Sequence, residues 1–169
     1  MGYSNICELG KERIRRAGAK IKEESPMTTM DLDTGFRVFK LDSSNRQDVY
    51  AAPGELDQQA LYQMEDNLKP DRSGLDLLFG CVLEWGLPLN LPYVSEEIDG
   101  CTVHTYGENQ DLIACFDRDV PESVITEIAK RQPLLAVFRD ASFRDSPAKI
   151  NAGEIFKFYA SDITRVKVI

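Results

Sequence analysis

The sequence contains no long apolar run. Its longest uninterrupted stretches, Leu112 to Phe116 and Leu134 to Phe138, have five residues each, whereas a helix that crosses a bilayer needs roughly 20 apolar residues. The first twenty residues also lack the apolar core of a signal peptide, because basic side chains between Lys11 and Arg16 interrupt it. We therefore expect a cytoplasmic protein without a membrane-spanning helix.

Cysteines and catalytic glycine motifs are equally scarce. Four cysteines in 169 residues are too few for a disulfide framework, and they lie in apolar stretches, which predicts buried, reduced thiols. None of the eleven glycines belongs to a dinucleotide-binding loop, a phosphate-binding loop or the turn that carries a hydrolase nucleophile. No lysine follows an acidic residue by two positions, the spacing with which the commonest restriction nucleases hold a metal. These absences argue against the commonest enzyme classes.

Basic side chains are concentrated at the N-terminus of an otherwise acidic chain. The net charge is −8, but residues 1–22 carry +4 and residues 23–169 carry −12. An acidic surface repels a phosphate backbone, so only the N-terminal segment is suited to nucleic acid. The candidate contacts to DNA phosphates, or to an acidic partner, are Lys11, Arg13, Arg15, Arg16, Lys20 and Lys22. The alternative is an ordinary solvated helix face.

The size of the chain is that of one ordinary domain, preceded here by a helix. Residues 4–22 predict this helix, because apolar residues recur near one stripe and basic residues occupy the rest. We assign residues 1–24 to the basic helix, residues 25–34, which have no apolar period, to a linker, and residues 35–169 to the domain.

The first half of the domain is expected to hold a strand, two helices and a hairpin. Asp99-Gly100 is the strongest short-range hairpin signal, because both positions of its turn favour a positive φ. The expected elements are a strand at Phe36–Leu41, helices at Glu55–Leu68 and Ser73–Trp85, and hairpin strands at Tyr93–Ile98 and Cys101–Tyr106.

The second half predicts parallel strands. The two apolar runs described above suit strands covered on both faces, and the helix between them is expected from a variant capping box formed by Asp119 and Glu122. Strand, helix and strand in this order predict a right-handed βαβ unit. A helix over residues 146–159 and a strand over residues 165–169 complete the chain. The expected fold class is α/β, or α+β: a mixed sheet with a central parallel βαβ unit, a β-hairpin addition and flanking helices.

Charged side chains follow both apolar strands. Ligands of parallel sheets bind beyond the carboxyl ends of the strands, so these side chains are candidates for a cleft. They are Asp117, Arg118, Asp119, Arg139 and Asp140. A structural ion pair or turn residues are the alternative, which we favour.

Cys101 and His104, the single histidine, have a spacing that suggests zinc. Residues an odd number apart in a strand point to opposite faces of a sheet, so the two side chains cannot meet one metal in a regular strand. We therefore predict no metal site, a buried cysteine and a surface histidine.

Residues 90–93, Asn-Leu-Pro-Tyr, resemble the Asp/Asn-Pro-Pro-Tyr loop with which amino-group methyltransferases hold a flipped-out base. Leucine replaces the first proline, and the glycine-rich turn that binds S-adenosylmethionine is missing. The alternative is a plain connection between a helix and the hairpin.

Several longer strings lie in order along the chain. They are ICELGKERIRRAG at 6–18, GFRVFKLDSSN at 35–45, DLLF at 76–79, LIACFD at 112–117, AVFRD at 136–140 and IFK at 155–157. They resemble the region that follows the methyltransferase sheet in the modification subunits of type III restriction-modification systems, which are adenine-N6 DNA methyltransferases. The resemblance extends from Gly2 to Ile169.

In that family the Asp-Pro-Pro-Tyr loop and the Phe-x-Gly-x-Gly cofactor loop lie upstream of this region. The resemblance therefore implies no catalytic, cofactor-binding or metal-binding residue in this chain, with S-adenosylmethionine bound elsewhere in the parent protein. It implies a C-terminal accessory domain, not an enzyme by itself, that serves dimerisation or docking of the restriction subunit. The expected partners are the missing upstream methyltransferase domain of the same polypeptide, the restriction subunit, a second copy and, mainly through the parent protein, DNA.

Two other functions remain open. The first is a module that contacts the DNA backbone through the basic helix at residues 11–22. The second is a small enzyme that uses the cleft around Asp117 and Arg139.

Overall fold

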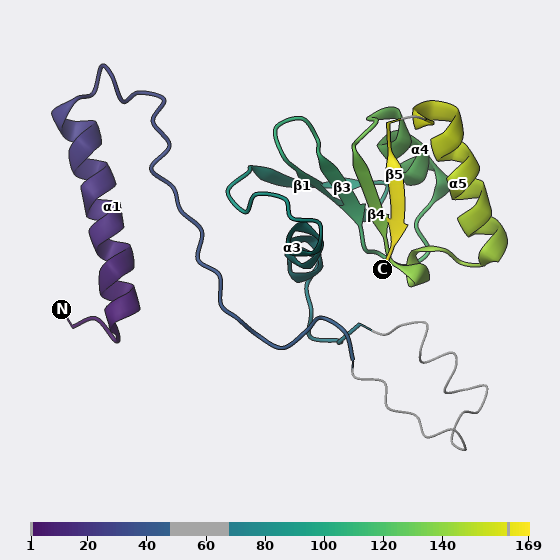
Figure 1. The fold of residues 1–169 in the computed structure, drawn as a ribbon, viewed down its shortest axis with the longest axis horizontal. Helices are drawn as coiled ribbons and strands as arrows, with labels where there is room; N and C mark the ends of the chain where they lie inside the picture. The colour runs from purple at the N-terminus through teal and green to yellow at the C-terminus, as the bar shows by residue number, and fades with distance from the viewer. Residues whose placement is uncertain (1, 48–67, 162) are drawn as a thin grey trace. The chain divides into compact units, whose positions relative to one another are not determined.

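The computed structural model describes residues 2–47, 68–161 and 163–169. The chain forms two compact units, which divide between Leu41 and Asp42 (Figure 1). Each unit is described by itself below.

The first unit is a long helix with an irregular segment against it. Helix α1 spans Ile6–Glu24 and begins at Asn5, whose side chain accepts a hydrogen bond from the Glu8 backbone N–H at 2.9 Å. The segment after the helix packs on α1 at Gly18, which has no side chain. A Cβ at Gly18 would lie 2.9 Å from the Cβ of Thr34, so glycine allows this close approach.

The strand predicted at Phe36–Leu41 is wrong. These residues are irregular, and in the described part of the chain no strand pairs with them. Phe36 instead lies beneath the Arg15 guanidinium, 5.6 Å from its ring centroid. A segment with alternating apolar residues forms a strand only when a neighbouring strand pairs with its backbone N–H and C=O groups. The helix predicted at 55–68 lies outside the described residues, except for Leu68, which forms an isolated bridge with Arg46.

The second unit is built on a five-stranded mixed sheet in the order β1-β2-β3-β4-β5. The first three strands pair antiparallel, and the last three pair parallel. Their bounds are Tyr93–Ile98, Cys101–Tyr106, Leu112–Cys115, Leu135–Phe138 and Arg165–Val168. The expected α/β fold class, with its parallel βαβ unit and added hairpin, is confirmed.

The hairpin turns at Asp99 and Gly100, as predicted. Their φ angles are 47° and 78°, and both lie in the left-handed region that the tight turn between twisted strands requires. The register places Ile98 opposite Cys101 and Ser95 opposite His104.

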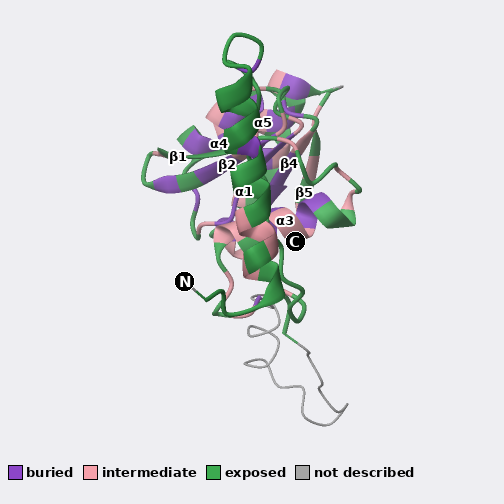
Figure 2. Cartoon of the chain, turned by 90° about the vertical axis from the view of Figure 1, so that its left-hand side faces the viewer, coloured by how far each residue is buried: buried purple, intermediate pink, exposed green. Residues whose placement is uncertain are grey.

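Helices cover both faces of the sheet (Figures 1 and 2). Helices α4, Glu122–Lys130, and α5, Ser146–Ala160, pack on one face against β2, β3 and β4. Helix α3, Gly74–Glu84, packs on the other face. Alternate residues along each central strand therefore enter different cores. Ile113 and Cys115 face α4 and α5, whereas Leu112 and Ala114 face α3.

Helix α4 begins later than the sequence predicts. Its N-cap is Pro121, which has no side-chain cap, and Asp119 does not form the predicted capping box. Asp119 instead has a φ of 49°, and its backbone N–H donates to the Ala141 carbonyl at 3.2 Å. The turn between β3 and α4 therefore uses Asp119 for its backbone conformation and not for capping.

No helix in the described ranges 2–47, 68–161 and 163–169 combines the length and the apolar character needed to cross a bilayer.

Candidate functional site

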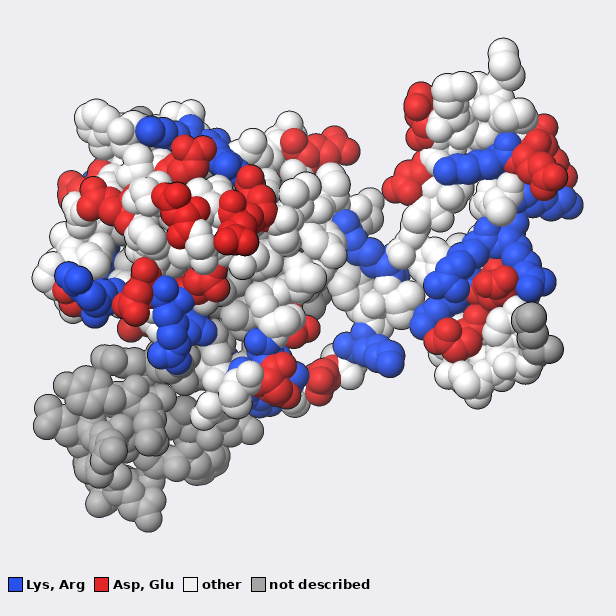
Figure 3. All heavy atoms as spheres, turned by 180° about the vertical axis from the view of Figure 1, so that it is seen from behind, with Lys and Arg blue, Asp and Glu red and all other residues white. Residues whose placement is uncertain are grey.

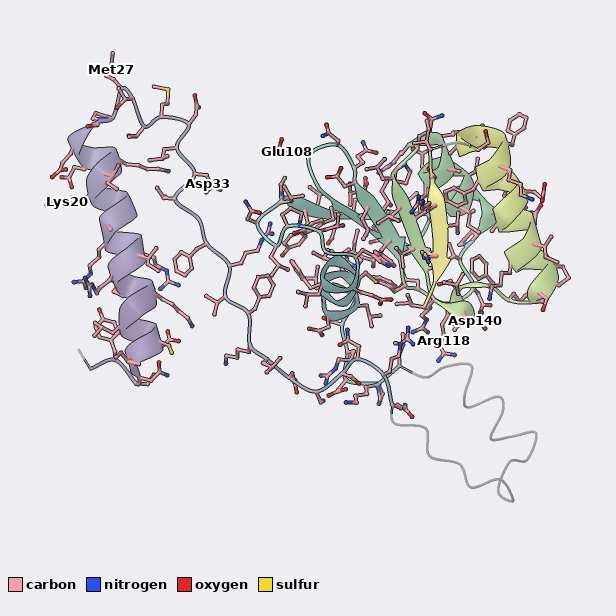
Figure 4. The ribbon with its side chains drawn as sticks, in the orientation of Figure 1. Lys20, Met27, Asp33, Glu108, Arg118 and Asp140 are labelled. Carbon is pink, nitrogen blue, oxygen red and sulfur yellow. The ribbon has the colours of Figure 1, made fainter. Side chains whose placement is uncertain are left out.

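The residues predicted to form a cleft lie at one edge of the sheet. Strands β3 and β4 are parallel, so the segments that follow them emerge on the same side. Figure 4 shows Arg118 and Asp140 at this edge, beside the end of β5. The Asp117 carboxylate accepts a short hydrogen bond from the Thr102 backbone N–H, and Asp140 forms an ion pair with Lys149.

The remaining members of this group are parts of tight turns. Arg139 precedes the 3-10 helix η1, Asp140–Ser142, and its backbone N–H donates to the Ser142 hydroxyl at 3.3 Å. The Arg139 Nε is buried and has no hydrogen-bond partner within the described residues. A cavity opens beside Asp117, but none of the other four residues lines it. The structure thus brings the five residues to one edge without enclosing a common cleft that includes Arg139.

The basic residues of α1 are partly neutralised by glutamates on the same helix. Lys11 lies 2.6 Å from Glu8, and Arg16 lies 2.8 Å from Glu12. Arg15 lies 4.0 Å from Glu12 and Lys20 lies 3.5 Å from Glu24, whereas Arg13 and Lys22 have no acidic partner in the described part of the chain. The hydrogen bond from Lys11 lowers the pKa of Glu8 below its usual value. Figure 3 shows this interleaving of blue and red side chains along α1.

The apolar stripe of α1 is only partly covered. Ile14, near its centre, is 52% exposed, and most of the helix surface is exposed as well (Figure 2). The exposed apolar side chains of the helix are Ile6, Leu9, Ile14 and Ile21. The segment that packs on α1 meets it at Gly18, one turn from Ile14 on the same side of the helix, so this part of the stripe is about half covered. The exposed part of the stripe is free to pack against another surface.

His104 corrects one prediction and supports another. It is only 5% exposed and not a surface residue, because α3 covers this face of the sheet. Cys101 is buried in the opposite core, so the two side chains do point to opposite faces. The Cys101 thiol instead groups with Cys115 and Asp117, whose ligand atoms all lie within 4.8 Å of one another.

The cysteines are free thiols, and three of the four are buried as expected. Burial raises the pKa of the Cys115 thiol to about 12 and also raises the pKa of Cys101. Without a metal ion both thiols are therefore protonated at neutral pH, which makes them poor nucleophiles. Cys7 contradicts the prediction because it is exposed on α1.

Residues 90–92 lie in the connection from α3 to β1, and Tyr93 begins β1. The Pro92 carbonyl accepts a hydrogen bond from the Gly107 backbone N–H at 2.8 Å, which ties the connection to the end of β2. Tyr106 reaches the same connection, since its hydroxyl donates to the Pro88 carbonyl at 2.6 Å. These contacts give the segment a structural role next to the hairpin.

Comparison of the chain with protein-family models, with curated proteins and with solved structures finds no match.

Proposed function

We propose that the chain is a C-terminal accessory domain of the modification subunit in a type III restriction-modification system, an adenine-N6 DNA methyltransferase. The domain performs no chemistry itself and serves assembly, by pairing two copies or by docking the restriction subunit. The family assignment rests on the ordered strings between residues 6 and 157. The assembly role rests on the exposed apolar side chains of the α1 stripe.

The stripe supports assembly because it has the composition of a buried helix face. Ile6, Leu9, Ile14 and Ile21 lie on one side of α1 and remain exposed. Burial of apolar area contributes about 25 cal/mol per Å², so contact between these side chains and another apolar surface is favourable. DNA phosphates offer no such surface.

Helix α5 offers a matching surface. Phe158 is 80% exposed and Ile150 is 67% exposed, although both lie on a helix whose other face belongs to the core. An open groove of about 500 Å³ runs along the helix, lined in part by Phe158, Ile155 and Glu154. The Glu154 carboxylate is ion-paired with Lys157, which also lines the groove, so the groove offers mainly apolar contact to a helix that carries isoleucines.

A second copy is the occupant that we propose. Residues 1–22 carry +4 and residues 23–169 carry −12, so α1 is attracted to an acidic body at long range, whereas α5, with two lysines and one glutamate, contributes apolar contact and not charge. Dimerisation is therefore the form of assembly that we propose for the isolated chain. In this dimer the α1 stripe of each copy packs on the α5 groove of its partner.

Sedimentation velocity tests this proposal. The unmodified chain is expected to sediment as a concentration-dependent dimer, whereas Ile14→Asp is expected to sediment as a monomer with unchanged circular dichroism. Ala19→Asp is the matched control, because Ala19 is exposed on the side of α1 opposite the stripe. A monomeric unmodified chain, or equal effects of the two substitutions, would contradict the proposal.

The alternative function, contact with the DNA backbone through α1, is supported by Arg13 and Lys22. These two residues have no acidic partner in the described chain and so keep their full charge for phosphates. Fluorescence anisotropy with a duplex separates the two functions. Binding that weakens steeply with salt, and weakens again in the double variant Arg13→Ala, Lys22→Ala, would support DNA contact.

A further inference from the structure

A small cavity lies between the first turn of α3 and the strands β2 and β3. Its volume is about 210 Å³, and its lining includes Gly74, Thr102, His104, Phe116 and Asp117. This space admits water molecules or a small organic group. No lysine or arginine is among the lining residues.

His104 presents an unused nitrogen at the wall of this cavity. Its Nδ1 lies 2.7 Å from the Ser95 hydroxyl, which fixes the ring. Its Nε2 has no hydrogen-bond partner within the described residues and lies against Gly74, where a Cβ would approach it to 2.5 Å. The side chain is 5% exposed. This nitrogen is available at the cavity wall to hydrogen-bond water or a ligand.

The electrostatic character of the cavity favours a cation. The Asp117 carboxylate accepts one backbone hydrogen bond, from Thr102, and faces no basic side chain in the lining. The N-terminus of α3 would attract an anion, but Asp76 already occupies it through a capping box with Ser73. Hydrogen bonds from Ser73 lower the pKa of Asp76, so this cap is an ionised carboxylate.

We propose that this cavity binds a guanidinium group. A guanidinium is planar and carries five N–H donors, so it can donate to the Asp117 carboxylate and to the His104 Nε2 together. The ring nitrogen accepts when Nδ1 carries the proton and donates it to Ser95. The Phe116 ring, also in the lining, provides an aromatic surface beside which a guanidinium is stable. This proposal is independent of the proposed dimer.

The single histidine makes the proposal directly testable by NMR. With ¹⁵N-labelled histidine, the chain gives one pair of imidazole signals, and propylguanidinium is titrated as the probe. We expect a saturable shift of the His104 Nε2 signal. Asp117→Asn should weaken binding about tenfold, because a hydrogen bond to a charged group is lost. Asp99→Asn, the same charge change in the hairpin turn, should leave binding unchanged.

Neutral and anionic probes complete the test. Propylurea, the uncharged isostere, and inorganic phosphate should cause no saturable shift. Equal binding of propylurea, no shift with propylguanidinium, or unchanged binding in Asp117→Asn with retained circular dichroism would each overturn the proposal. Two further ligands distinguish the possible sources of the guanidinium group. Preference for N-acetyl-arginine amide assigns the cavity to an arginine side chain of a protein, whereas preference for free arginine assigns it to a small metabolite.

Discussion

Ser95 and His104 face each other across the first two strands, with the serine Oγ 2.7 Å from the imidazole Nδ1. Ser95 lies on the edge strand, yet it holds the ring of a histidine buried beneath α3. Gly74 leaves room for the other side of the ring. Ser95 and Gly74 therefore hold the His104 imidazole in a buried position. The sequence pattern of the strand alone predicts a surface histidine here.

Burial lowers the pKa of His104 below its ordinary value, and the nearby Asp117 opposes this shift only in part. The folded state therefore binds a proton less readily than the unfolded state. The stability contribution is complete above the unfolded pKa of about 6.5 and is lost as the pH falls through the lower folded pKa. Urea unfolding should show this loss below about pH 6.5 in the unmodified chain relative to His104→Gln. If the free energy of unfolding depended on pH in the same way in both proteins, a lowered pKa of His104 in the folded state would be contradicted.

Ala114 and Val137 test the central position of β3 and β4. Both are fully buried between the sheet and α3. Ala114→Asp or Val137→Asp would bury an unpaired carboxylate and should destabilise the domain by roughly 3–5 kcal/mol. Ser123→Asp, an exposed position in the first turn of α4, is the control and should cost little. Thermal melts by circular dichroism decide. Buried variants that melt like the control would exclude the central placement.

Substitution of alanine for two glycines should change the stability of the domain in opposite directions. Gly100 has a φ of 78° in the hairpin turn, so Gly100→Ala should destabilise by about 1–2 kcal/mol. Gly153 lies within α5, and a Cβ there would meet no atom within 4 Å. Gly153→Ala should therefore stabilise by about 0.5–1 kcal/mol. Urea titrations of both variants measure the difference. A Gly100→Ala variant as stable as the unmodified chain would mean that the hairpin turn does not require glycine, and a destabilised Gly153→Ala variant would mean that α5 has no room for a Cβ there.

The isolated chain should not bind S-adenosylmethionine. It lacks the glycine-rich cofactor loop, and residues 90–93 are tied to the hairpin through Pro92. Isothermal titration calorimetry should give only the heat of dilution. A saturable isotherm with one site per chain would require a cofactor site in this chain and would revive residues 90–93 as a functional loop.

Much of the sheet could be predicted because its signals are local. The run at 112–116 needs no partner to be recognised as a buried strand, and the turn at Asp99-Gly100 is specified by two residues. The failures depended on distant residues. Phe36 packs under Arg15 and not in the sheet, and His104 is buried because α3 covers it. The cavity beside His104 has no signal in the sequence, because its lining comes from three separate segments.

Mixing two monomeric variants tests the proposed assembly most directly. Ile14→Asp removes the stripe of α1, and Phe158→Asp removes the apolar wall of the α5 groove. Each variant alone should sediment as a monomer. In a 1:1 mixture, one copy retains an intact α1 and the other an intact groove, so one of the two contacts can form and a weaker dimer should return. A mixture that stays monomeric while the unmodified chain dimerises would show that α1 does not pack on α5 of a second copy.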